Sequence, residues 1–146
     1  MNLLKIIILT IFTVVAFAKI SAAGHHSVTF QYGGEFTNLN VVANGDFFSV
    51  SGAFIGTNRM TRENGDIIHL NFICPALFIN GDGNGTCKLK DAKSEDFFIL
   101  SWHCGTDGQC TGDVVNGTGR FEGATGSMTW WHDGGWGEGS GTFLLK

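Results

Sequence analysis

Apolar and polar residues alternate along most of the chain after residue 23. Between residues 27 and 32 the side chains of Val28, Phe30 and Tyr32 alternate with polar ones, and residues 46–55 repeat the pattern. Successive side chains of a β-strand point to opposite faces, so this period of two predicts strands with one buried face. No window after the N-terminal region keeps a helical period, and we therefore predict an all-β protein.

The predicted strands are separated by residues that favour tight turns. Asn44-Gly45 and Asn64-Gly65 are dipeptides that tolerate positive φ in a hairpin, and Asp133-Gly134-Gly135 precedes the last strand. Pro75 is expected at a strand end. The alternating segments are residues 27–32, 46–55, 67–74, 86–90, 97–104, 127–132 and 137–145. We count roughly eight strands in about 120 residues, which predicts one closed barrel or sandwich domain.

The first 23 residues differ from the rest of the chain. Lys5 is followed by the apolar run 6–18 and by small residues at 21–23. This order is typical of a secretory signal peptide. The apolar run is shorter than the ~20 residues that cross a bilayer as a helix, and an uncleaved anchor is the alternative. We predict a signal peptide at residues 1–23, a domain at residues 24–146, and a secreted or periplasmic protein without membrane contact after cleavage.

The charge balance argues against two classes of partner. The whole chain has 9 basic and 13 acidic residues, a net charge of −4. Loss of Lys5 and Lys19 with the signal peptide leaves 7 basic residues against the same 13 acidic ones, a net charge of −6. A negatively charged protein does not capture nucleic acid or anionic lipid electrostatically, so neither is an expected partner.

Four cysteines, Cys74, Cys87, Cys104 and Cys110, follow the predicted signal peptide. An even number of cysteines in an exported protein favours two disulfides. Of the three pairings, we favour Cys74 with Cys87 and Cys104 with Cys110, because each pair encloses a Gly-rich loop. A zinc site with four cysteine ligands is the alternative, but such sites usually contain Cys-x-x-Cys pairs, which this chain lacks.

The run GTGRFEGATGS at residues 117–127 contains four glycines. Its spacing is not the G-x-G-x-x-G of dinucleotide sites, and it lacks the Lys-Ser or Lys-Thr end of a P-loop. We therefore expect no phosphate site and no cofactor. In a β protein the run is better explained as a tight connection with Phe121 in the core. Beside it, Arg120 and Glu122 are expected to form a solvated ion pair.

Two segments resemble a known family. Residues 117–130, GTGRFEGATGSMTW, resemble the G-T-G-x-F-x-G-x-x-G segment of small secreted barrel proteins grouped with the allene oxide cyclase and dirigent proteins. Residues 85–102, GTCKLKDAKSEDFFILSW, resemble the strand, acidic turn and strand that precede this segment in bacterial relatives. The resemblance implies a calycin-like, eight-stranded antiparallel β-barrel. Plant members act on oxylipins or direct phenoxy-radical coupling, but no residue here matches their catalytic positions.

Aromatic residues supply the candidate ligand site. The chain has 13 Phe and 4 Trp, and Trp102, Trp130, Trp131 and Trp136 all fall in its second half. The interior of an eight-stranded barrel is either filled by side chains or holds one small ligand. We predict that the four Trp form the wall of a site for a small apolar or aromatic molecule. The glycines of residues 137–141 share one strand face, over which a Trp ring or a ligand ring could lie.

Two histidines follow the predicted cleavage site. Cleavage after Ala23 would place His26 third from the free amine, and cleavage after Ala22 would place His25 there. Amine, amide and imidazole nitrogens in that arrangement form a square-planar set suited to Cu(II) or Ni(II). A frayed terminus without a metal is the alternative.

The sequence leaves three functions open. Ligand binding in the barrel is the first, a cyclase or isomerase acting on a small hydrophobic substrate is the second, and a disulfide-stabilised extracellular interaction module is the third. His69, His103, His132 and Glu138 are most simply strand-face or rim residues. If His103, His132 or Glu138 were buried in an apolar cavity with a displaced pKa, that residue would favour the enzyme hypothesis. N-glycosylation sequons begin at residues 84 and 116, and they matter only in a eukaryote.

Overall fold

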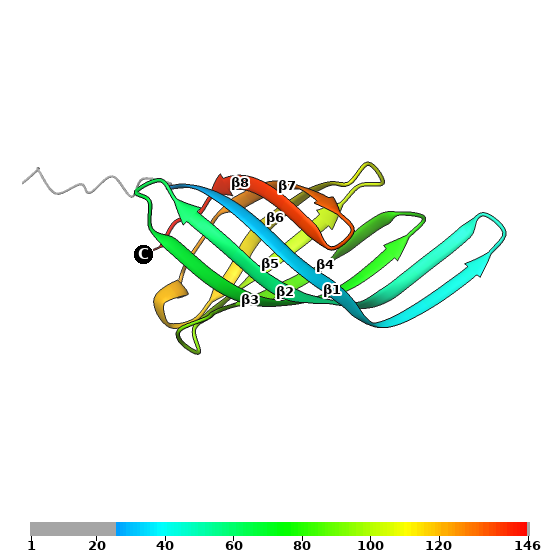
Figure 1. Ribbon diagram of the computed structural model, residues 1–146, viewed down its shortest axis with the longest axis horizontal. Coiled ribbons are helices and arrows are strands. Elements are labelled where there is room, and N and C mark those ends of the chain that lie inside the picture. Colours follow the sequence, from blue (N-terminus) through cyan, green and yellow to red (C-terminus); the bar gives the residue numbers. More distant parts are fainter. Residues whose placement is uncertain (1–25, 146) are drawn as a thin grey trace, which may run out of the picture.

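A computed structural model of the protein describes residues 26–145. These residues form eight β-strands and one turn of 3-10 helix (Figure 1). The strands are β1 (Ser27–Asn44), β2 (Phe47–Arg62), β3 (Ile67–Ile79), β4 (Asp82–Asp91), β5 (Phe97–Cys104), β6 (Gln109–Gly117), β7 (Ser127–Asp133) and β8 (Trp136–Thr142), and the helical turn is η2 (Gly119–Phe121). No helix within this part of the chain is long and apolar enough to cross a membrane.

The sheet closes on itself. Each strand pairs in antiparallel fashion with the next, and β8 pairs with β1. The all-β, eight-stranded antiparallel barrel is thus confirmed, and the sandwich is excluded. Alternation alone misses β6 because its inward position 112 is a glycine and its outward position 115 is an exposed valine.

Inward and outward positions alternate along the strands as the pattern predicts. In β1, Val28 and Phe30 are 2% and 6% exposed, whereas the intervening Thr29 and Gln31 face solvent. The same alternation in β3 buries residues 68, 70, 72 and 74. The inward-facing apolar side chains of the strands therefore form one continuous core inside the barrel.

The first hairpin is longer than alternation predicts. The predicted first strand ends at residue 32, but β1 continues to Asn44 and pairs with β2 as far as the turn at Gly45, whose φ is 58°. The alternation fades because both faces of this part are exposed: Val41 and Val42 are each 54% exposed. The turn end of the hairpin, cyan in Figure 1, therefore extends beyond the other hairpins.

Pro75 lies inside β3 and not at a strand end as predicted. It pairs with Ala53 of β2, and the regular pairing of β3 with β4 is interrupted on its other side. Proline has no N–H to donate, so it is tolerated where a ladder is broken. The Cys74–Cys87 disulfide spans this interruption, with the two Cα atoms 4.0 Å apart. A covalent bond thus links the two strands where backbone hydrogen bonds are missing.

Three phenylalanines fill one end of the barrel. Phe98, Phe121 and Phe143 are each 0% exposed. The ring centroid of Phe98 lies 5.3 Å from that of Phe121 and 4.9 Å from that of Phe143. Phe121 is the last residue of η2, which lies between β6 and β7. The run GTGRFEGATGS is therefore a tight connection with one ring in the core, as predicted.

The predicted Arg120–Glu122 ion pair is wrong. Arg120 Nη1 instead donates to Asp91 Oδ2 at 2.7 Å, and this carboxylate also accepts the backbone N–H of Lys93 at 2.8 Å. Asp91 is 4% exposed, whereas Glu122 faces solvent. The 3-10 turn directs Arg120 toward the end of β4. The pair, in which Asp91 is buried and Arg120 is exposed, therefore fastens η2 across the closed end of the barrel.

We expect Phe121→Ala to lower the free energy of unfolding by about 3–5 kcal/mol, because it removes a fully buried ring from a packed end. Val115→Ala is the control: Val115 is 58% exposed, and its truncation should change stability by less than about 0.5 kcal/mol. Urea unfolding with both disulfides intact measures the difference. Equal losses in the two variants would contradict the assignment of Phe121 to the core.

Candidate functional site

The other end of the barrel is hollow. A cavity of about 80 Å³ extends from the middle of the barrel to its rim, where Phe78 and His132 lie one residue before the ends of β3 and β7. Rings, aliphatic groups and sulfur atoms make up most of its wall. The lining residues are Phe30, Tyr32, Phe36, Phe54, Asn58, Met60, Phe72, Cys74, Ala76, Phe78, Cys87, Leu89, Leu100, Trp102, Cys104, Met128, Trp130 and His132.

Glycines of β8 make room for the rings of this wall. A Cβ atom on Gly137 would overlap the ring of Tyr32, and one on Gly139 would overlap Trp130 and Phe30. The rings of Phe30 and Trp130 meet edge to face, with centroids 6.2 Å apart. Aromatic residues, one of them a Trp, therefore cover Gly137 and Gly139 of the predicted glycine stripe, and Met128 covers Gly141.

Two disulfides border the cavity. Cys74 is bonded to Cys87, and Cys104 is bonded to Cys110, the pairing that the sequence favoured. Cys104 and Cys110 lie directly opposite each other where β5 and β6 begin to pair. Together the two bonds fix neighbouring strands at the hollow end. They also indicate that the protein resides in an oxidising, extracytoplasmic environment.

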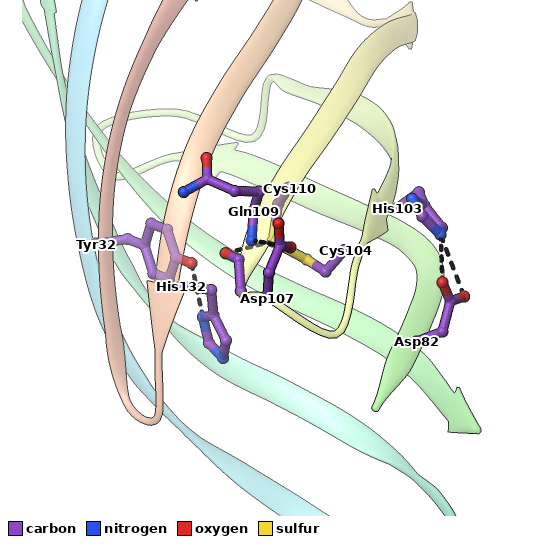
Figure 2. The surroundings of a disulfide bond; sticks show 9 residues. Tyr32, Asp82, His103, Cys104, Asp107, Gln109, Cys110 and His132 are labelled. Atoms are coloured by element: carbon purple, nitrogen blue, oxygen red, sulfur yellow. Dashed lines mark hydrogen bonds and ion pairs between the residues drawn. A yellow bond between two sulfur atoms is a disulfide. The ribbon is translucent and has the colours of Figure 1, made fainter. Parts of the chain in front are cut away.

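A tyrosine and a histidine meet inside the rim. The Tyr32 hydroxyl lies 2.7 Å from His132 Nδ1, and the two rings are nearly parallel, with centroids 5.9 Å apart (Figure 2). The edge of the His132 ring also meets Phe54 at a centroid distance of 5.5 Å. The pair joins β1 to β7, and aromatic rings surround its polar atoms.

Burial shifts both members of this pair toward their neutral forms. Loss of hydration lowers the pKa of His132 below the usual 6.5, and the nearby charge of Asp133 opposes the shift only in part. Loss of hydration likewise raises the pKa of the Tyr32 phenol, against an opposing hydrogen bond from the Trp130 side chain. Near neutral pH the cavity therefore holds an uncharged hydrogen-bonding pair.

Two further polar atoms in the cavity wall have no partner among the described residues. They are Oδ1 of Asn58, an acceptor, and Nε1 of Trp102, a donor. The two residues are only 7% and 8% exposed. A buried polar atom without a hydrogen bond costs about 1–3 kcal/mol. Neither atom is accessible from the cavity, so both are covered by neighbouring groups of the wall.

The four predicted tryptophans do not form one wall. Trp102 and Trp130 line the cavity. Trp131 and Trp136 lie on the outer face and are 43% and 49% exposed. Consecutive residues of a strand point to opposite faces, so Trp130 and Trp131 cannot both face the interior. The candidate site retains two of the four.

His69 and His103 lie on the outside of the barrel. His103 Nε2 lies 3.0 Å from Asp82 Oδ2, and His103 and His69 are both exposed. Figure 2 shows the side chains of His103 and Asp82 pointing toward each other. Glu138 is exposed near Gln31, and both sequon asparagines, Asn84 and Asn116, are exposed. Of the three groups named for a possible enzyme, only His132 faces the cavity.

The predicted N-terminal metal site remains a prediction. His25 lies outside the described residues, and His26 is exposed just before β1. Elsewhere in residues 26–145, no group of three His, Cys, Asp or Glu side chains is placed to hold a metal ion.

Sequence reasoning missed Tyr32 and Asn58 as site residues. A usable signal existed for both, because each is a polar group at an inward position of an alternating strand. Tyr32 is also the single tyrosine of the chain. Comparison of the chain with known protein families and with curated proteins found no match.

Because the pKa of His132 is lowered by folding, the unfolded chain binds more protons just below pH 6.5. We therefore expect the free energy of unfolding to fall as the pH falls through this window. Urea unfolding from about pH 5 to pH 8 measures the slope. His132→Asn should lose this contribution, whereas His69→Asn, which changes an exposed histidine, should keep it. Equal slopes in the two variants would contradict the assignment.

Proposed function

We propose that the protein is a secreted or periplasmic β-barrel that binds a small apolar or aromatic ligand in its open mouth, without catalysis. The observation that carries this proposal is the cavity, which is lined by aromatic rings and is open at the rim. Concave, mostly apolar sites with few polar groups are the usual form of small-molecule sites. Apolar surface buried by the ligand would supply the affinity.

The contrast between the two ends of the barrel supports the same proposal. The cavity occupies about 80 Å³ at the open end. The closed end shows that the chain can fill its interior with rings. A larger residue at Ala76, which lies in the cavity wall, would fill the open end in the same way.

Export and family membership belong to the proposal. The charged, apolar and small residues of positions 1–23 support a cleaved signal peptide, and the two disulfides agree with export. The segment GTGRFEGATGSMTW supports a place among the barrel proteins grouped with allene oxide cyclase and dirigent proteins. The closed eight-stranded barrel is the fold that this resemblance implies.

The Tyr32–His132 pair favours a second candidate, a cyclase or isomerase acting on a small hydrophobic substrate. A neutral imidazole in an apolar cavity is able to accept a proton, and a phenol is able to donate one. Displaced pKa values of this kind cluster at catalytic sites. An interaction module is the third candidate, which the exposed Trp131 and Trp136 would suit, but it has no need of an open cavity.

Fluorescence titration with N-phenylnaphthylamine, a neutral aromatic probe, tests the binding proposal. We expect saturable binding to one site, with quenching of tryptophan emission. The double variant Trp131→Phe/Trp136→Phe should keep this quenching because it retains both cavity tryptophans. Trp102→Phe/Trp130→Phe should lose most of it. Ala76→Phe, which fills the cavity, should abolish binding.

The outcomes separate the candidates. Absence of saturable binding by the unaltered protein would sink the binding proposal and leave the interaction module. If a bound small molecule is recovered chemically changed from the unaltered protein but unchanged from His132→Asn, the enzyme replaces the binder. Recovery of an unchanged molecule from both supports binding without catalysis.

A further inference from the structure

The cavity is too small to enclose a whole ligand. Its volume is about 80 Å³, whereas a cavity of about 150 Å³ holds benzene and typical ligand pockets measure about 300–1,000 Å³. Only one end of a molecule therefore fits between the three-phenylalanine plug and the rim. The rest must lie outside the rim, on whatever surface continues the cavity wall.

The chemistry of the lining indicates what that end contains. No Lys, Arg, Asp or Glu from residues 26–145 lines the cavity. An ionised group placed there would lose its hydration without gaining a counter-ion. The lining therefore favours an uncharged end.

An apolar surface continues the wall beyond the rim. Phe78, which lines the cavity, pairs with Val50 of β2, and Val50 pairs with Val41 of β1. Paired residues of neighbouring strands share a face, so Val41 and Val50 continue the inner face of the barrel. The next inward row is Ala43 with Phe48, which is 45% exposed.

The base of the hairpin holds this surface in place. The pairing of β1 with β2 shifts between Thr37 and Asn40, and such a bulge bends a strand. Leu39 covers Gly52 at this point, with its Cδ2 3.1 Å from the position of a glycine Cβ. The backbone N–H of Phe48 donates to Asn80 Oδ1 at 2.8 Å, which ties the hairpin to the β3–β4 turn.

We propose that the ligand is an elongated, uncharged molecule, one end of which enters the cavity and whose apolar remainder lies on the inner face of the β1–β2 hairpin. This inference rests on the proposed ligand-binding function. The inner face from Phe54 to Phe48 is about 20 Å long, at ~3.3 Å per residue, which suits an extended chain. Each methylene buried there would tighten binding by up to about four-fold.

Three probes of different chemistry test the proposal. They are decan-1-ol, butan-1-ol and the decanoate anion, and displacement of bound N-phenylnaphthylamine measures each affinity. We expect decan-1-ol to bind at least about ten-fold more tightly than butan-1-ol, because its longer chain reaches the hairpin. Decan-1-ol should also bind at least about ten-fold more tightly than decanoate, whose charge has no partner in the cavity. Equal affinities of decan-1-ol and decanoate would overturn the proposal.

Two adjacent valines provide a matched pair of variants. Val41 lies on the inner face and Val42 on the outer face, and both are 54% exposed. Val41→Asp should weaken decan-1-ol binding by about ten-fold, because it places a charge beside the apolar chain, whereas Val42→Asp should leave it unchanged. Equal effects of the two substitutions would overturn the proposal. So would sedimentation showing that either substitution dissociates an oligomer, because the hairpin would then cover a second copy.

If the aromatic probe itself fails to bind the unaltered protein, the proposed function fails and not only this inference.

Discussion

The width of an eight-stranded barrel limits how many inward side chains can share one level of its interior. Large rings fit only where the neighbouring strands carry small residues. In this protein β8, which pairs with both β1 and β7, supplies the small residues, so the side chains of Tyr32, Phe30 and Trp130 lie over Gly137 and Gly139. At the closed end, three phenylalanines occupy the same width without glycine partners from β8. The distribution of small and large residues thus determines which end is filled and which is hollow.

A narrow apolar interior also determines how its few polar groups behave. Aromatic neighbours remove water from Tyr32 and His132, so the pair satisfies its hydrogen bonding internally and remains neutral. Asn58 and Trp102 each have a polar atom without such a partner. Opposite consequences therefore follow from one cause. Where two polar groups meet, the low dielectric strengthens their contact, and where one stands alone, it makes that group costly.

The strand pattern and the closed fold were predictable because alternation reports burial directly. Contacts between strands were less predictable, since the register of a barrel is not readable from one chain. Tyr32 and His132 are 100 residues apart and meet only because β8 closes against β1. The sequence prediction placed Trp130 and Trp131 in the same wall, whereas consecutive residues of a strand point to opposite faces. Arg120 pairs with Asp91 and not with Glu122, because the 3-10 turn directs its side chain toward the end of β4.

Most of the features that do not stabilise the fold are gathered at one end. The closed end largely obeys the ordinary rules of stability: its rings are fully buried and the carboxylate of Asp91 is paired, whereas Nε of Arg62 is buried without a partner among the described residues. The hollow end breaks several of them, with an unfilled volume, two unpartnered polar atoms and exposed apolar residues such as Val41 and Phe48. Departures of this kind occur where function opposes stability. An occupant with one end in the cavity and an apolar tail on the hairpin would fill the volume and cover the exposed apolar residues.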